Sequence, residues 1–179
     1  MRAAGHAADD LLRLVIREEA GGDVAAIDRV TQDAFRHHPF SQQTEHRIVR
    51  ALRDGGALRL SLVATLDDHL MGHVAFSAVT IGGLDRGWWG LGPLSVAPAL
   101  QRRGIGSALV RSGLRRLGER RVAGCVVLGD PAYYARFGFA PHAGLRLPGP
   151  PADHFMACAI EGSVPDGEVA YHPAFSDPS

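Results

Sequence analysis

Two closely spaced glycines, Gly104 and Gly106, separate an apolar run from residues with helical spacing. The run at 91–98 is typical of a strand, and 108–110 of the first turn of a helix, so the glycines fall between the two. Glycine has no Cβ, and its backbone can therefore approach a ligand closely and direct several N–H groups toward it. Since the first N–H groups of a helix lack partners within it, residues 101–107 predict a phosphate-binding turn.

Two better-known phosphate motifs do not fit this turn. A Walker loop needs Gly-Lys-Ser/Thr, and the chain contains no lysine. The dinucleotide fingerprint needs a third small residue where Leu109 stands. The alternative without a ligand is a turn that merely starts a helix. Because short glycine motifs also occur by chance, a functional interpretation needs a second motif.

That second motif is Tyr-Tyr-Ala-Arg-Phe-Gly-Phe at 133–139. Together with Leu-x-Val-x-Pro at 94–98 and Gln-Arg-Arg-Gly-Ile-Gly at 101–106, it closely resembles the two signatures of the GNAT superfamily of N-acetyltransferases. Two motifs in the family's order are much more specific than either alone. The resemblance covers almost the whole chain, from roughly residue 12 to 175.

The resemblance implies a single-domain α/β (α+β) architecture, the GNAT acyl-CoA N-acyltransferase fold. We expect a mixed, mostly antiparallel sheet, splayed at its central strand, with helices on both faces. The domain would span 11–175, between tails at 1–10 and 176–179. Gly90, Gly92 and Pro93 interrupt the strand at 88–96, which predicts a bulge there.

The sequence patterns place the individual elements. Short apolar runs indicate strands and 3.6-residue spacing indicates helices, with Asp23 and Asp130 as caps. The expected strands are 11–18, 58–66, 70–81, 88–96 and 124–128, followed by strands and loops that include the apolar runs 145–147, 155–160 and 169–175. The expected helices are 24–35, 44–54, 104–121 and a short one from Pro131. The strand at 124–128 should lie parallel to that at 88–96.

The activity implied by the resemblance is transfer of acetyl from acetyl-CoA, the cosubstrate, to a primary amine of a small molecule or peptide. The amine would attack directly in a ternary complex, without a metal. Tyr134 matches the family's general acid, which protonates the departing thiolate. The residues expected to bind CoA are Leu94, Ser95, Val96, Gln101, Arg102, Arg103, Gly104, Ile105, Gly106, Ser107, Tyr133 and Phe137.

The sequence does not identify the general base, and several residues are alternatives for it. No carboxylate stands on the strand at 88–96, where some relatives keep a general base. Asp130, His73 or a chain of waters are the alternatives, although a lone histidine on a strand is more often structural. A backbone N–H of Leu94 or Ser95 would stabilise the oxyanion. The segment before Tyr133 is also shorter than in many relatives, which leaves the CoA contacts beyond the turn open.

The composition of the chain limits the classes of partner that it is expected to bind. The chain has 179 residues, zero formal net charge and a pI near 7.1, so no overall field would attract nucleic acid or a membrane surface. Cys125 and Cys158 lie in apolar runs and show no metal-ligand spacing, which indicates structural thiols. The first residues lack the apolar core of a secretory signal, so we expect a cytoplasmic protein. A homodimer is possible by resemblance.

Two other functions compete with the enzyme. The first is a non-catalytic acyl-CoA-binding or sensing module, which the missing strand carboxylate favours. The second is a toxin that acetylates aminoacyl-tRNA. Neutral overall charge argues against it, because phosphate contacts supply most of the affinity for RNA.

Overall fold

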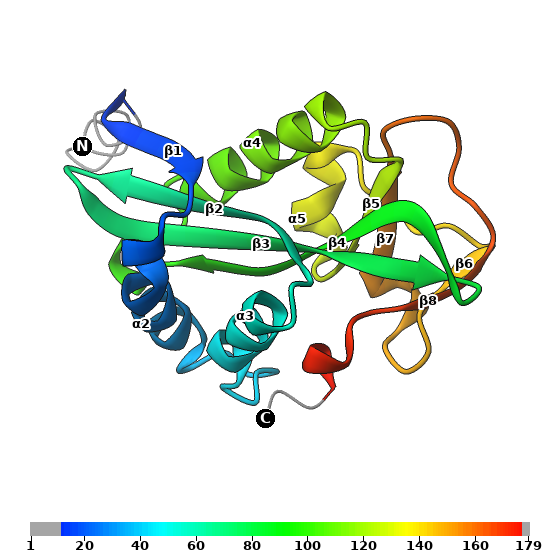
Figure 1. Cartoon of the computed structure of the whole chain (residues 1–179), viewed down its shortest axis with the longest axis horizontal. Helices are drawn as coiled ribbons and strands as arrows, with labels where there is room; N and C mark the ends of the chain where they lie inside the picture. Colours follow the sequence, from blue (N-terminus) through cyan, green and yellow to red (C-terminus); the bar gives the residue numbers. More distant parts are fainter. Residues whose placement is uncertain (1–11, 177–179) are drawn as a thin grey trace.

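The computed structural model describes residues 12–176 of the chain. The expected tail at 1–10, and the expected tail at 176–179 apart from Ser176, lie outside the described residues. Helices cover both faces of a central sheet (Figure 1). The helices are α2 (Val24–Phe35) and α3 (Glu45–Asp54) on one face, and α4 (Ile105–Glu119) and α5 (Pro131–Tyr134) on the other.

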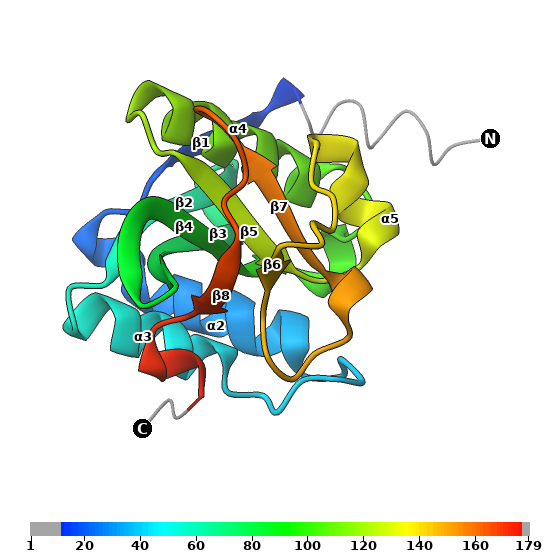
Figure 2. The ribbon, with the colours of Figure 1, turned by 90° about the vertical axis from the view of Figure 1, so that its right-hand side faces the viewer.

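The sheet is mixed and mostly antiparallel. Its main path runs in the order β1-β2-β3-β4-β5-β7, and only the β4–β5 pair along it is parallel. Figure 2 shows β5 and β7 side by side, with β6 and β8 next to them. The strands are β1 (Leu14–Glu18), β2 (Leu58–Leu66), β3 (His69–Ile81), β4 (Leu84–Val96), β5 (Gly124–Leu128), β6 (Leu145–Arg146), β7 (Phe155–Ala159) and β8 (Gly167–Ala170). The expected sheet with helices on both faces is confirmed.

The sheet splits between β4 and β5. Their pairing runs from Trp88, opposite Gly124, to Leu91, opposite Val127, and goes no further. The last three residues of β4 pair only with β3. Between Leu91 and Leu94 of β4 the register with β3 shifts, which places the expected bulge at Gly92. The second edge of β4 is therefore open to another extended chain.

Some boundaries differ from expectation. β1 begins at Leu14, later than predicted, and β4 begins at Leu84, earlier than predicted, because its hairpin with β3 continues to the Ile81–Leu84 pair. The apolar run at 169–175 is strand only to Ala170. It ends because Pro173, which has no N–H to donate to a ladder, begins a short 3-10 turn.

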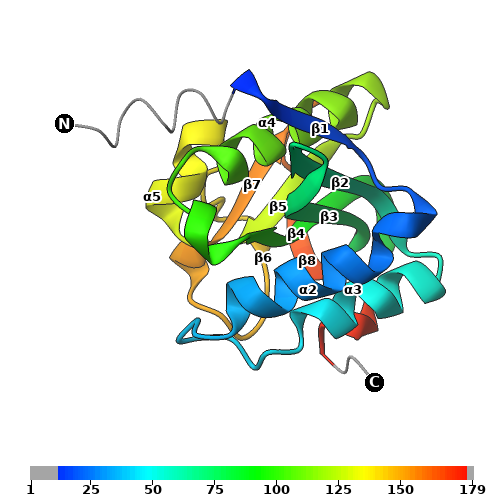
Figure 3. The ribbon, with the colours of Figure 1, turned by 90° about the vertical axis from the view of Figure 1, so that its left-hand side faces the viewer.

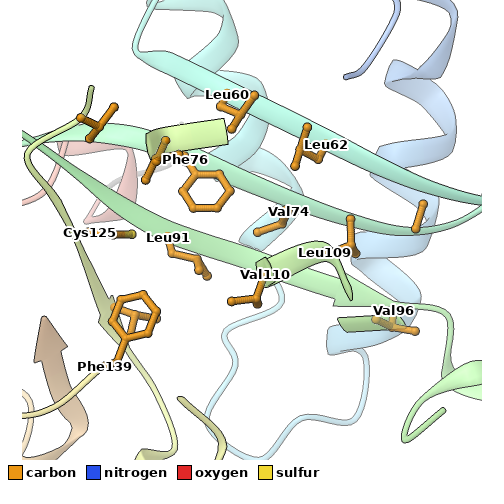
Figure 4. Close-up of a cluster of buried hydrophobic side chains, with 14 of the residues drawn as sticks. Leu60, Leu62, Val74, Phe76, Leu91, Val96, Leu109, Val110, Cys125 and Phe139 are labelled. Atoms are coloured by element: carbon orange, nitrogen blue, oxygen red, sulfur yellow. The ribbon is translucent and has the colours of Figure 1, made fainter. Parts of the chain in front are cut away.

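The main core lies between the sheet and α4. Phe76 of β3 is fully buried there, and Figure 4 shows it among side chains from β2, β4, α4 and β5. Cys125 is buried in this core and Cys158 is partly buried. Labelled members are Leu60, Leu62, Val74, Leu91, Val96, Leu109, Val110 and Phe139.

Two glycines of α4 should respond oppositely to alanine. A Cβ on Gly113 would overlap the buried ring of Phe76, whereas one on Gly118 would meet only Ile160, at 3.9 Å. We expect Gly113→Ala to destabilise the protein by about 1–3 kcal/mol through overpacking. Gly118→Ala should stabilise it by about 0.5–1 kcal/mol, because alanine is the better helix former. Urea unfolding of both variants measures the difference, and equal shifts would contradict this packing of α4.

Two absences hold for residues 12–176. None of the helices there is both long enough and apolar enough to cross a membrane. Likewise, no three His, Cys, Asp or Glu side chains in that part of the chain are placed to hold a metal ion.

Candidate active site

The predicted phosphate-binding turn has the backbone that such a turn needs. Arg102 and Gly104 both have left-handed conformations, with φ of 64° and 90°. The first helical hydrogen bond of α4 runs from the Ala108 N–H to the Gly104 carbonyl (2.9 Å). The N–H groups of Ile105, Gly106 and Ser107 precede it and point out of the helix start. A turn and helix start of this form favour an anion.

The side chains of this turn have different roles. Gln101 donates from Nε2 to the Val96 carbonyl (3.0 Å), so it ties the turn to the end of β4. Arg102 is exposed, and Arg103 is half-buried. Sequence reasoning placed all three at the CoA site, and the structure brings all three next to the open strand edge. The Gln101 side chain is directed at β4.

Three predicted segments meet at Gly106. A Cβ there would lie 2.9 Å from the Tyr133 hydroxyl, 3.6 Å from Val96 Cγ2 and 3.8 Å from Leu94 Cδ2. The open end of β4, the start of α4 and helix α5 are therefore in contact at this point. The missing side chain makes room for the Tyr133 hydroxyl, which explains why glycine is needed there.

Tyr134 lies in an aromatic cluster beside this junction. Its ring makes edge contacts with Tyr133 (4.9 Å between centroids) and Phe139 (5.8 Å). The absence of a side chain at Gly129 lets the ring pass, since a Cβ there would be 2.5 Å from Tyr134 Cε2. Burial raises the pKa of the phenol, and the nearby Tyr133 and Cys125 raise it further. The Tyr134 phenol therefore keeps its proton at neutral pH.

Two arginines near the cluster were missed by sequence reasoning. Arg111 of α4 lies over the Phe137 ring, 5.1 Å from its centroid, and Arg136 lies 4.5 Å from the Tyr133 centroid. Phe137 is therefore flanked by guanidinium groups, since Arg136 also approaches it to 5.5 Å. Helical spacing could have indicated Arg111, because it lies two turns beyond Gly104 on the same face of the helix.

The candidate bases lie in different places. Asp130 is exposed, and its carboxylate accepts a hydrogen bond from the Ala132 N–H (2.9 Å), so it serves as the predicted cap of α5. His73 is completely buried in β3, on the face of the sheet that α2 and α3 cover. Its Nε2 is 2.8 Å from the Ser61 hydroxyl. Ser61 in turn bonds to Glu19, which is paired with Arg53 (2.8 Å).

His73 should make the protein sensitive to acid. Burial lowers its pKa from 6.5 to about 4, although Glu19 opposes the shift. Between pH 6.5 and about 4 the unfolded chain therefore binds a proton at this histidine, and the folded chain does not. The stability of the fold consequently decreases as the pH drops through this range. We expect the free energy of unfolding to fall by about 3 kcal/mol from this group. Urea unfolding from pH 7 to 4 tests it, and His73→Gln should lose that part of the slope; parallel curves would contradict it.

Comparison with known proteins identifies the same family as the sequence motifs. Residues 24–139 match the family model described as "Acetyltransferase (GNAT) family". The Escherichia coli K12 protein "Uncharacterized N-acetyltransferase YhbS" is 40% identical over 159 residues, which cover 84% of this chain and 94% of YhbS.

Two solved structures are similar over most of the chain. The first is a GNAT family acetyltransferase from Brucella melitensis in complex with acetyl-CoA, with 48% identity and a TM-score of 0.82. The match covers 90% of this chain and 97% of that one. The second is YhbS from E. coli in complex with CoA, with 36% identity and a TM-score of 0.84, over 92% and 93% of the two chains.

Proposed function

The chain belongs to the GNAT family of acetyltransferases, and from this premise we propose that it transfers acetyl from acetyl-CoA to a primary amine by direct attack in a ternary complex. The observation that carries the proposal is the open edge of β4, which leads straight into the left-handed turn and the start of α4. An extended arm with amide groups fits the first, and a diphosphate fits the second. The similar Brucella and E. coli structures are complexes with acetyl-CoA and CoA.

The residues of this chain then have separate tasks. The backbone of Leu94, Ser95 and Val96 would pair with the arm that carries the thioester, and an N–H of Leu94 or Ser95 would stabilise the oxyanion. The N–H groups of residues 105–107 would hold the diphosphate, and Arg102 and Arg103 would contact the diphosphate or the 3′-phosphate of CoA. Tyr134 would donate its proton to the departing sulfur. Most of the acceleration would come from holding the amine against the carbonyl carbon.

The thiols argue against a covalent acetyl-cysteine route. Burial raises the pKa of both Cys125 and Cys158, so neither is a good nucleophile at neutral pH. Neither thiol has a basic side chain among its hydrogen-bond partners in the described part of the chain. Direct attack by the amine is therefore the better mechanism.

Release of free CoA tests the proposal. The purified protein is incubated with acetyl-CoA and a panel of primary amines that includes polyamines, amino-acid amides and short peptides, and a thiol reagent detects CoA. We expect amine-dependent release and intersecting double-reciprocal lines. Acetyl-CoA binding without release for any amine would support a sensing module instead. Parallel lines would indicate an acetyl-enzyme.

A further inference from the structure

Buried polar side chains gather on one face of the sheet. Those of β2, β3 and β4 are Ser61, Thr65, His73, Ser77 and Ser95, and all of them point toward α2 and α3, whereas the α4 face is lined by apolar residues. Figure 3 shows α2 and α3 crossing beneath these strands. Burying polar groups costs free energy unless they are hydrogen-bonded, so their connections are informative.

Two of these side chains, Ser61 and His73, are joined to Glu19 and Arg53 in a series of hydrogen bonds. Arg53 of α3 donates to both carboxylate oxygens of Glu19, at 2.9 and 2.8 Å. The Ser61 hydroxyl contacts the same carboxylate and also lies 2.8 Å from His73 Nε2. This series of hydrogen bonds runs from the half-buried Arg53–Glu19 pair, beyond the end of β1, to the completely buried imidazole of His73 in β3.

The hydrogen count of Ser61 fixes the tautomer of His73. A serine hydroxyl has one hydrogen, and a carboxylate can only accept, so Ser61 donates to Glu19. The Ser61 oxygen must then accept from His73 Nε2, which places the imidazole proton there. His73 Nδ1 is left with a lone pair, and it has no hydrogen-bond partner within residues 12–176. It is a buried proton acceptor that nothing in the described chain uses.

This acceptor lies one strand away from the open edge of β4, on the strand that pairs with the other edge. His73 is directly opposite Ser95 in the β3–β4 register, so the two side chains are neighbours on the α2 face. Ser95 is the middle residue of the segment that would hold the thioester arm, and its hydroxyl makes only a long contact with Thr31 of α2 (3.4 Å). The Ser95 hydroxyl is therefore only weakly held and can turn to another partner.

We propose that His73 takes up the proton that the attacking amine must lose, through the hydroxyl of Ser95. This inference rests on the proposed function. As the amine nitrogen bonds to the carbonyl carbon, its N–H proton passes to the Ser95 oxygen, and the Ser95 proton passes to Nδ1. The C–S bond breaks, and its electron pair leaves with sulfur, which takes a proton from Tyr134. After product release His73 returns its proton to solvent through Ser95, and Tyr134 is reprotonated from solvent.

The charges around His73 suit this role. The facing ionisable groups are Glu19 from the loop after β1, Arg53 from α3 and Asp28 from α2. Glu19 lies across Ser61 from the ring and would stabilise the imidazolium, while Arg53 keeps the carboxylate ionised. At neutral pH the resting imidazole is uncharged, so its lone pair is available. The amine becomes strongly acidic once it has attacked the carbonyl, so a weak base is sufficient to take its proton.

The tautomer is tested on the unmodified protein. Nitrogen-15 NMR of histidine-labelled protein distinguishes a protonated Nε2 from a protonated Nδ1. We expect neutral His73 with its proton on Nε2 at pH 7, and a mixture of tautomers in Ser61→Ala, which removes the acceptor. A proton on Nδ1 in the wild-type protein would overturn the proposal, whether or not any variant folds.

Turnover tests the route itself, with the amine from the panel that releases CoA fastest. His73→Gln and Ser95→Ala should each lower kcat about 100-fold, and the double variant should be no slower than the slower single variant. Ser77→Ala is the matched control, because it removes a buried serine hydroxyl of β3 that has no hydrogen-bond partner among the described residues, and it should keep wild-type turnover. Added imidazole should restore part of the turnover of His73→Ala, which a purely structural defect would not allow.

The outcomes separate this inference from the proposed function. If the wild-type protein releases no CoA with any amine, the proposed function fails. If it releases CoA and His73→Gln stays within about three-fold of it, or the losses in the double variant multiply, the relay alone is wrong.

Discussion

Tyr134→Phe is expected to lower kcat about 100-fold while the Kd for CoA stays within about two-fold. Burial raises the pKa of the phenol, so it holds its proton at neutral pH. In the proposed mechanism it passes that proton to the departing sulfur, and the change removes only its oxygen. The ring keeps its edge contacts with Tyr133 and Phe139, which preserves the fold. Steady-state kinetics with saturating acetyl-CoA and calorimetric titration with CoA measure the two quantities.

Tyr133→Phe is the matched control for this prediction. The Tyr133 hydroxyl lies at Gly106 and not in the aromatic cluster, so its loss should affect CoA affinity more than kcat. If Tyr134→Phe instead kept wild-type kcat, or lost turnover only through weaker CoA binding, Tyr134 would not be the proton donor.

Gly106→Val is expected to raise the Kd for CoA about 100-fold, which is about 3 kcal/mol. The new side chain would fill the junction of β4, α4 and α5 and push against the Tyr133 hydroxyl, Val96 and Leu94. Those are the residues between which the thioester arm and the diphosphate would lie. Calorimetric titration measures the affinity, and the melting temperature checks that the variant is folded.

Gly118→Ala is the control, because it changes a glycine of the same helix that has space around it and lies near the opposite end. Its Kd for CoA should match the wild type. A folded Gly106→Val protein with wild-type affinity would mean that CoA binds elsewhere.

The parts of the site with local signals were predicted from the sequence. Gly104 and Gly138 have positive φ, as expected for a glycine turn and a helix C-terminus. Asp130 caps the short helix that carries Tyr134. The strand, turn, helix and parallel strand from β4 to β5 were also predicted, because each depends on interactions within a few residues.

The network around His73 was beyond sequence reasoning. Glu19, Ser61 and His73 come from three different parts of the chain, and Arg53 from a fourth. Their meeting depends on the β2–β3 register and on the way α3 packs against the sheet. A shift of one residue would turn each strand side chain to the opposite face, so no local pattern could specify the contact.

By itself, the sequence determined the glycine turn at 101–107, the order of the elements and the position of Tyr134, since these follow from backbone preferences and short-range spacing. Only the tertiary structure decided that β4 stops pairing with β5 after Leu91, that Tyr133 contacts Gly106, and that the buried polar groups face α2 and α3. The physical reason is that these features depend on strand register and layer packing, which bring together residues distant in the chain.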